Sequence, residues 1–230
     1  KASADACVLF VLDDAEPAGK PFWGPYAISQ PARAALGRQW AARGHIITFA
    51  SREPRGEKAA ALVEAAGANA SAATVAQAVS RSSIVVLATP FSAVAAVLDE
   101  TGDLAGKVVV DCTNPIAPGL RPLFDSDTSG AEQIARLAPG ARVVKAFNST
   151  GAENMADPRY GDQAATMFLC GDDELAKAAV WQLAEELGFD LVDAGPLPAA
   201  RHLENLALLW IHLAQVNGMG RRIAFRLMRR

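Results

Sequence analysis

A small hydroxyl residue and an arginine, Ser51 and Arg52, follow the buried-strand pattern of Ile46–Ala50. Such a pair offers a hydroxyl and a fork of guanidinium donors, which suit a phosphate dianion. In strand–helix–strand units that bind dinucleotides, the end of the second strand faces the adenosine ribose. A carboxylate there selects a 2′-hydroxyl, whereas an arginine accommodates a 2′-phosphate. Ser51 and Arg52 therefore predict binding of NADP(H) rather than NAD(H).

The same stretch leaves another interpretation open. Glu53 places an acid beside the arginine, where it would repel a phosphate unless its side chain turned outward. Residues 51–54 would equally suit an exposed turn that binds no ligand.

Strand and helix patterns alternate along the chain and must position these residues. Ala34–Arg43 is amphipathic and ends at Gly44, and Ile84–Ala88 is a β-branched run of the kind buried on both faces of a sheet. The expected strands are Ile46–Ala50, Ile84–Ala88, Lys107–Cys112, Arg142–Phe147, Thr166–Cys170 and Phe189–Asp193. The expected helices are Ala34–Arg43, Gly56–Ala66, Thr74–Ser80, Phe91–Leu98, Ala131–Leu137, Asp172–Leu187 with Asp172 as its cap, Ala199–Val216 and Gly220–Arg230.

This order predicts an α/β fold, a doubly wound and mostly parallel Rossmann-like sheet with a helical C-terminal extension. Residues 1–145 would form the NADP-binding part, and residues 146–230 a smaller α/β segment that completes the sheet and the substrate cleft. In such a sheet ligands lie beyond the carboxyl ends of the strands. Three strand ends are therefore candidate sites: Ala88 to Phe91, Asp111 to Pro115, and Lys145 to Asn148.

Composition limits the kinds of partner. A formal net charge of −3 over 230 residues gives no broad positive surface for nucleic acid or an anionic membrane. No apolar run approaches the roughly 20 residues of a membrane span. Cys7, Cys112 and Cys170 are far apart in the sequence, which favours a reducing, cytoplasmic setting. The three histidines lie apart from the cysteines, so we expect no metal site.

Several ordered blocks of the sequence resemble the NADPH-dependent reductases of coenzyme F420. The likeness runs from about Leu36 to the end of the chain. The blocks are Trp40–His45, Ser51–Pro54, Ala88–Pro90, Asp111–Pro115, Val144–Asn148, Gly151–Met155, Asp193–Leu197, Ala200–Glu204 and Leu209–Ile211. The resemblance is less specific for the substrate, because the group includes proteins of unknown acceptor and the cytoplasmic domain of membrane ferric reductases.

The resemblance implies an enzyme that passes hydride between NADP(H) and coenzyme F420 or a flavin-like acceptor. It assigns the 2′-phosphate to Ser51 and Arg52, and the nicotinamide half to Ala88, Thr89 and Pro90. It lines the crevice of the acceptor ring with Asn114, Lys145, Phe147 and Asn148. Hydride transfer between stacked rings needs orientation and exclusion of water rather than a protein nucleophile, so no catalytic residue is expected.

Residues 1–35 diverge from the family. Its members begin with a strand and G-x-G-x-x-G, whose backbone amides reach the pyrophosphate. Here Ile28, Gln30 and Arg33 occupy the three glycine positions, and Pro31 removes one amide donor. Three explanations stay open: weak NADP(H) binding in which Arg33 replaces the amides, a non-catalytic relative that keeps the fold for binding or assembly, and an altered reading of the coding sequence before residue 36.

Local patterns offer simpler roles for several of these residues. Lys145 would extend to the surface, Phe147 would pack in the core, and Asn114 would only end a strand. Glu204 and His212 would make a helix–helix hydrogen bond or a dimer contact rather than take part in catalysis. The run Leu208–Ile211 is so apolar that we expect a cover, either a second copy in a homodimer or the chain itself. The sequence leaves the acceptor and the direction of hydride flow open.

Overall fold

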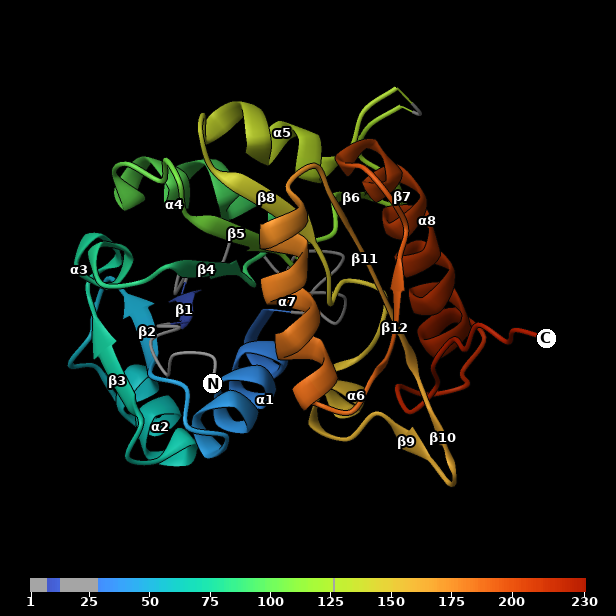
Figure 1. Cartoon of the computed structure of the whole chain (residues 1–230), viewed down its shortest axis with the longest axis horizontal. Helices are drawn as coiled ribbons and strands as arrows, with labels where there is room; N and C mark the ends of the chain where they lie inside the picture. Colours follow the sequence, from blue (N-terminus) through green and yellow to red (C-terminus); the bar gives the residue numbers. More distant parts are fainter. Residues whose placement is uncertain (1–7, 13–28, 126) are drawn as a thin grey trace.

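The computed structural model describes residues 8–12, 29–125 and 127–230, which are organised around one eight-stranded sheet (Figure 1). The strand order is β12-β11-β8-β5-β4-β1-β2-β3. The strands are β1 (Val8–Leu12), β2 (Ile47–Ser51), β3 (Ala70–Ala73), β4 (Ile84–Leu87), β5 (Val108–Asp111), β8 (Arg142–Lys145), β11 (Thr166–Gly171) and β12 (Asp190–Asp193). Neighbours are parallel except β8 and β11. The mostly parallel, doubly wound α/β sheet predicted from the sequence is confirmed.

Helices cover both faces of the sheet, as Figure 1 shows. They are α1 (Ser29–Ala42), α2 (Glu57–Ala66), α3 (Val75–Ser80), α4 (Val94–Thr101), α5 (Gly130–Leu137), α6 (Ala152–Ala156), α7 (Glu174–Glu186) and α8 (Ala200–Ile211). Val86 and Val110 join a core with α1, α2 and α7, whereas Val85 and Val109 join a second core with α3, α4, α5 and α8. Successive strand residues point to opposite faces, so both faces need apolar side chains and the strands read as continuous apolar runs.

The strand order reverses direction at β1. The chain passes outward from β1 to β2 and β3, then crosses to β4 on the other side of β1 and continues to β5 and β8. In doubly wound sheets the ligand lies at the carboxyl ends of the strands beside this reversal. Residues 13–28, between β1 and α1, lie outside the described residues. They include Ile28, which stands at the first of the three positions where the family has glycine. Gln30 and Arg33 lie within α1.

The C-terminal segment Gly220–Arg230, predicted as a helix, has no regular secondary structure, so that prediction was wrong. Gly218 and Gly220 have positive φ values of 69° and 79°, which turn the chain out of the helical conformation after α8. Beyond them the amide of Thr166 in β11 donates a hydrogen bond to the carbonyl of Phe225 over 2.9 Å. Long-range backbone hydrogen bonding here replaces the helical pattern.

Two smaller features also differ from the expectation. Strand β3 was not predicted, because Ala-Ser-Ala-Ala has little β propensity, and it forms by parallel pairing with β2. Asp173 rather than Asp172 caps α7, since its carboxylate accepts a hydrogen bond from the amide of Ala176 over 2.8 Å. Asp172 instead accepts from the amide of Leu197 over 2.8 Å.

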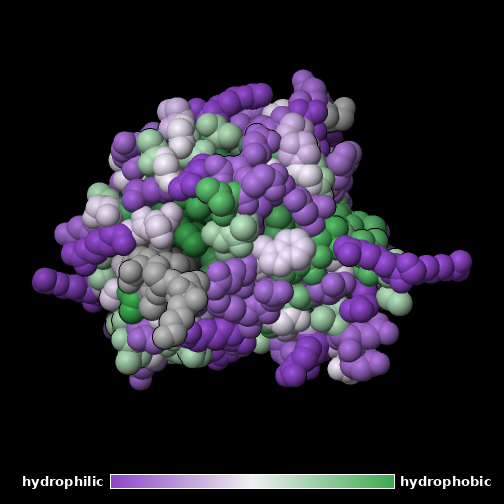
Figure 2. Space-filling view, viewed as in Figure 1, coloured by the Kyte–Doolittle hydropathy of each residue, from purple (hydrophilic) through white to green (hydrophobic). Residues whose placement is uncertain are grey.

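The apolar run on α8 is largely covered by the chain itself. Trp210 and Ile211 are buried, with Ile223 and Phe225 packed against them. The Trp210 indole also donates to the Ile223 carbonyl over 2.8 Å. Leu209 stays 48% exposed, and Figure 2 shows apolar surface on the side of the molecule where α8 lies. Within the described ranges, no helix has the length and apolar character needed to cross a membrane.

The antiparallel pairing of β8 with β11 leaves little room for a side chain at Gly171, so a single added methyl group there should lower stability. A Cβ at Gly171 would lie 2.8 Å from the carbonyl oxygen of Val143 and 3.3 Å from a methyl of Val144. Because a strand carbonyl cannot move aside without breaking its pairing, we expect Gly171→Ala to lower the free energy of unfolding by about 1–3 kcal/mol. Urea denaturation measures this change.

Gly56→Ala is the control, since the backbone there has φ −73° and the nearest contact of a new Cβ is 3.2 Å. We expect its effect to stay below about 1 kcal/mol. Equal losses in the two variants would contradict a steric constraint specific to the β8–β11 junction.

Candidate functional site

A buried ammonium group lies at the carboxyl ends of β5 and β8. The side chain of Lys145 is fully buried. Its Nζ donates to Asp111 Oδ2 over 2.8 Å, to the Thr113 carbonyl over 2.6 Å and to Glu204 Oε1 over 2.9 Å. The prediction that Lys145 extends to the surface was wrong, because carboxylates from β5 and α8 compensate its charge inside the protein.

The charge state of this cluster follows from two opposed effects. Burial by itself lowers the pKa of Lys145, but the carboxylates of Asp111 and Glu204 outweigh it and raise the pKa above the ordinary value. Lys145 is therefore charged at neutral pH. Asp111 is held in turn by Thr113, whose amide and hydroxyl donate to Oδ1 over 2.8 and 2.6 Å.

Glu204 joins α8 to the first turn of α5. Its carboxylate accepts hydrogen bonds from the amides of Gly130 over 3.1 Å and Ala131 over 3.3 Å. A negative charge at a helix N-terminus is favourable, because the first amides have no partner within the helix. Gly130 allows this approach: a Cβ there would lie 2.8 Å from the ring of Phe91. Of the two roles that the sequence left open for Glu204, the helix–helix hydrogen bond is confirmed, with Glu204 as the acceptor.

An ion pair gives α5 and α8 a further contact, one turn earlier on α8. Arg201 donates from Nε and Nη2 to the two carboxylate oxygens of Glu132 over 2.9 and 2.6 Å. The hydrogen bond from Arg201 lowers the pKa of Glu132. This planar, two-bond geometry fixes the orientation of α8 against α5.

Asn114 and Asn148 form a pair across the ends of β5 and β8. Asn148 Nδ2 donates to Asn114 Oδ1 over 3.0 Å and to the Leu203 carbonyl over 2.9 Å. Asn114 Nδ2 donates to the Asn148 carbonyl over 2.9 Å. These bonds fix the Asn148 amide so that Oδ1 remains a buried acceptor, and it has no hydrogen-bond partner among the described residues.

The end of β4 carries a second buried polar atom of this kind. Thr89 is 3% exposed, and its hydroxyl oxygen likewise lacks a hydrogen-bond partner in the described part of the chain. Ala88 before it is buried and Pro90 after it is half-buried. Strands β4 and β8 flank β5 in the sheet. Buried polar atoms are normally hydrogen-bonded, so two unpartnered atoms at the carboxyl ends of these strands mark a place where a ligand would complete the structure.

The end of β2 places the predicted phosphate ligands. Ser51 is buried, and its hydroxyl accepts the amide of Glu53 over 3.0 Å, which fixes the turn after the strand. The Arg52 side chain is 43% exposed, and its Nε and Nη2 contact Glu100 Oε1 of α4 at 2.8 and 2.7 Å. Glu100 was not predicted from the sequence, since it lies 48 residues further along.

Phe147 contributes packing from its place after β8. Its ring is buried and lies edge-to-face with Trp40 at a centroid distance of 5.6 Å and with Phe189 at 6.4 Å. The core position suggested by the local pattern is confirmed. Phe147 also has a φ of 60°, a left-handed conformation that is rare for an aromatic residue and that turns the chain toward Asn148.

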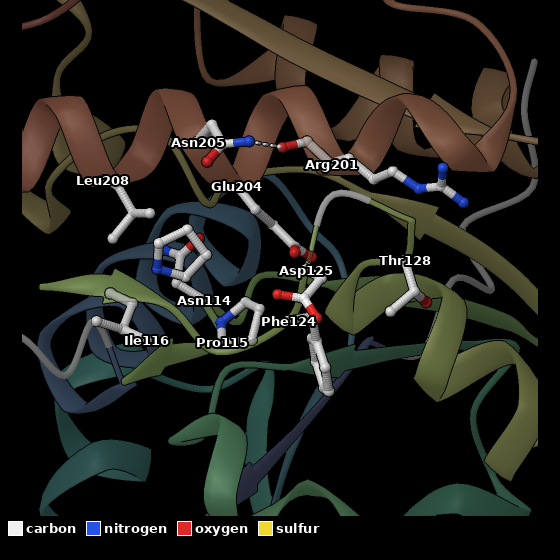
Figure 3. A pocket seen from close by; sticks show the side chains of 11 residues that line it. Asn114, Pro115, Ile116, Phe124, Asp125, Thr128, Arg201, Glu204, Asn205 and Leu208 are labelled. Carbon is white, nitrogen blue, oxygen red and sulfur yellow. Dashed lines mark hydrogen bonds between the residues drawn. The ribbon is translucent and has the colours of Figure 1, made fainter. Parts of the chain in front are cut away.

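A hollow opens beside this cluster, between α8 and the loop that follows β5 (Figure 3). Its empty volume, which includes space open to solvent, is about 530 Å³. The described residues that line it are Asn114, Pro115, Ile116, Pro122, Phe124, Asp125, Thr128, Arg201, Glu204, Asn205 and Leu208. In Figure 3, Glu204 points from α8 toward the loop, and Leu208 faces Ile116 across the hollow.

Of the residues assigned to the acceptor crevice, Asn114 lines this hollow. Lys145, Phe147 and Asn148 are not among the described residues that line it, although Asn148 is bonded to Asn114. Arg201 also lines the hollow and was not predicted as a site residue. The feature of the sequence that could have indicated it is an arginine in the first turn of an otherwise apolar helix.

The two described cysteines and the acidic and histidine side chains were considered as a nucleophile and as metal ligands. Burial, together with the charge of Asp111, raises the pKa of Cys112, and burial raises the pKa of Cys170 to about 12. Both thiols are therefore protonated at neutral pH. Across the described ranges, no three histidine, cysteine or acidic side chains gather as metal ligands would.

The Lys145 cluster predicts a large stability loss when its positive charge is removed. Lys145→Met would leave Asp111 and Glu204 buried without compensation, and we expect the free energy of unfolding to fall by about 3–5 kcal/mol. Because the folded-state pKa is raised above 10.5, this contribution is complete below pH 10.5 and declines only at higher pH. Urea denaturation of both proteins at pH 8 measures the loss.

Arg159→Met provides the comparison, since Arg159 and Asp157 form an ion pair with side chains 74% and 60% exposed. Its expected effect is below about 0.5 kcal/mol. A Lys145→Met loss no larger than that of Arg159→Met would contradict the role given to the buried charge.

Comparisons with known proteins show which proteins this chain is similar to. A family model described as NADP oxidoreductase, coenzyme F420-dependent, matches residues 32–115. A structure described as an F420-dependent NADP-reductase from Arthrobacter sp. FB24 is 28% identical with a TM-score of 0.81, and the match covers 97% of this chain and 100% of that one. An imine reductase from Aspergillus terreus, in complex with NADPH4 and dibenz[c,e]azepine, is 21% identical with a TM-score of 0.63, and the match covers 94% of this chain and 64% of that one. The likeness to the imine reductase shows the fold alone.

One curated relative comes from the rat. Metalloreductase STEAP3 of Rattus norvegicus is 39% identical over 106 residues, which make up 46% of this chain and 21% of the relative. The chain thus spans about one fifth of the length of that relative.

Proposed function

Because the chain belongs to the Rossmann-type family of NADP oxidoreductases described as coenzyme F420-dependent, we propose that it transfers hydride between NADP(H) and the ring of F420 or of a flavin. The observation that carries the proposal is the pair of buried, unpartnered acceptors, Thr89 Oγ1 and Asn148 Oδ1, at the carboxyl ends of β4 and β8. A bound ligand with hydrogen-bond donors would satisfy both atoms.

The residues present fit a dinucleotide with a 2′-phosphate. Arg52, at the end of β2, would bind the phosphate, and the buried Ser51 hydroxyl shapes the turn that presents it. Ala88, Thr89 and Pro90 would hold the nicotinamide half at the end of β4. Bound NADPH would supply the hydride from C4 of its nicotinamide. The protein would contribute orientation and exclusion of water, and no side chain need act as a nucleophile.

The hollow beside α8 suits the ring of the acceptor. Pro115, Ile116, Phe124 and Leu208 give it apolar walls, which favour a flat, largely apolar ring. Glu204 and Arg201 at its edge are already paired within the protein, with Lys145 and with Glu132. Asn114 would present hydrogen-bonding groups to the ring. Phe147 and Lys145 would support this crevice from inside the core.

Two further features belong to the proposal. The unpaired Cys112 and Cys170 favour a reducing, cytoplasmic setting for the reaction. A homodimer through α8 now rests on Leu209, since Trp210 and Ile211 are covered by the chain itself.

A second candidate is flavin-mediated reduction of ferric iron. The observation that favours it is the 39% identity to a metalloreductase over 106 residues. The deciding assay offers NADPH with F420, with FMN, or with FMN and a ferric chelate, and follows nicotinamide absorbance. Rapid oxidation of NADPH with F420 alone or with FMN alone supports the first candidate, whereas oxidation that requires both FMN and the ferric chelate supports the second. A chain that binds NADPH and reduces nothing would be the non-catalytic relative.

Removal of the predicted phosphate ligand tests the cofactor. We expect Arg52→Ala to weaken NADPH binding at least tenfold and to leave NADH binding unchanged, because only NADPH carries the 2′-phosphate. Titration with each nucleotide, followed by nicotinamide fluorescence, measures both affinities.

Arg55→Ala removes the same charge from an exposed position three residues later and serves as the control. Equal effects of the two substitutions would indicate general electrostatic attraction rather than a phosphate site. If the unmodified chain binds neither nucleotide, the proposed function fails.

The unpartnered hydroxyl at the end of β4 gives an independent prediction. Thr89→Val keeps the shape of the side chain and removes a buried polar atom that has no partner among the described residues. We expect the melting temperature to stay constant or rise, because burial of such an atom is unfavourable. The rate of hydride transfer should fall severalfold, since the ligand loses a hydrogen bond. A lower melting temperature with unchanged rate would contradict a ligand-binding role for Thr89.

A further inference from the structure

An acid of α4 already occupies the arginine proposed to bind the cofactor phosphate. Glu100 Oε1 lies 2.8 Å from Nε and 2.7 Å from Nη2 of Arg52, so one carboxylate oxygen takes an entire edge of the guanidinium group. That edge can form two parallel hydrogen bonds to a carboxylate or a phosphate.

We propose that Glu100 is a specificity-determining residue of the cofactor site, which competes with the 2′-phosphate for Arg52 and so reduces the preference for NADPH over NADH. This inference rests on the proposed function, since it requires Arg52 to bind the 2′-phosphate. Glu100 need not touch the cofactor, because it acts by contact with Arg52.

Charge balance at the end of β2 supports the competition. Among the described residues, Arg52 carries one positive charge, whereas Glu53 next to it in the sequence and Glu100 in contact with it carry one negative charge each. A 2′-phosphate bound to Arg52 would bring up to two more negative charges close to the Glu100 carboxylate. At separations of about 4 Å like charges repel one another even in water, so Glu100 must move away or weaken phosphate binding.

Exposure makes this exchange feasible. The Arg52 and Glu100 side chains are 43% and 38% exposed, and an ion pair this exposed to solvent contributes little to stability. The pair is thus weak enough for a phosphate to displace the carboxylate. Its loss should leave the fold intact, in contrast to the buried Lys145 cluster, where both carboxylates are needed inside the protein.

The test measures NADPH and NADH affinities of the Glu100→Gln variant, which keeps the size of the side chain and removes its charge. We expect NADPH binding to tighten about fivefold and NADH binding to stay constant, with the gain reduced at high salt. Asp99→Asn is the matched control, because it removes the same charge from the adjacent exposed position of α4. It should change neither affinity by more than about twofold.

The double variant Glu100→Gln with Arg52→Ala tests the route of the effect. If Glu100 acts through Arg52, the double variant binds NADPH as weakly as Arg52→Ala alone. A gain that persists without Arg52, or a gain matched by Asp99→Asn, overturns the inference. So does unchanged or weaker NADPH binding in Glu100→Gln while Arg52→Ala remains defective, and the proposed function then stands. If the unmodified protein binds neither nucleotide, both fail together.

Discussion

The positive charge of Lys145, buried between Asp111 and Glu204, is the interaction on which the arrangement of the candidate site depends. Each of its three hydrogen bonds reaches a different part of the site: Asp111 at the end of β5, the Thr113 carbonyl two residues later, and Glu204 on α8. Removing an ammonium group from water is costly, so the cluster is stable only with all these partners in place. The C-terminal helix is thereby held to the end of the sheet.

Several properties of the hollow follow from this attachment. Glu204 can cap α5 because α8 is held close, and Arg201 on the same helix reaches Glu132 of α5. The Leu203 carbonyl, on the same turn of α8 as Glu204, fixes the amide of Asn148. One wall of the hollow therefore comes from α8 and the opposite wall from the loop after β5 (Figure 3). A rigid wall of this kind suits a reaction that needs orientation more than it needs a reactive side chain.

The two ends of the proposed site differ in how their charges are held. At the acceptor end the charges are buried and mutually compensated, so they shape the site, and each of them needs its partners in place. At the end of β2, Arg52 and Glu100 are partly exposed and exchangeable, so their pairing can respond to a ligand. The physical difference is solvation: water stabilises separated charges at the surface, whereas the interior requires them to stay paired.

The sequence by itself determined the layers of the fold and the strand ends where ligands would lie. Runs such as Ile84–Leu87 and Val108–Asp111 are β-branched because both sheet faces are buried, and that pattern is local. It also indicated Thr89, Asn114 and Asn148, since residues after parallel strands meet at one edge. Strand β3 escaped prediction, because its alanines and serine become a strand only by pairing with β2.

Only the tertiary structure decided the burial of Lys145, the pairing of Arg52 with Glu100 and the extended path of residues 220–230. The partners of Lys145 lie 34 and 59 residues away, and the partner of Arg52 lies 48 residues away. The charge of a side chain is local information, but the identity of the group that compensates it depends on which strands and helices the fold brings together. The Thr166–Phe225 hydrogen bond follows the same rule, because a backbone amide carries no sequence signal for a partner 59 residues distant.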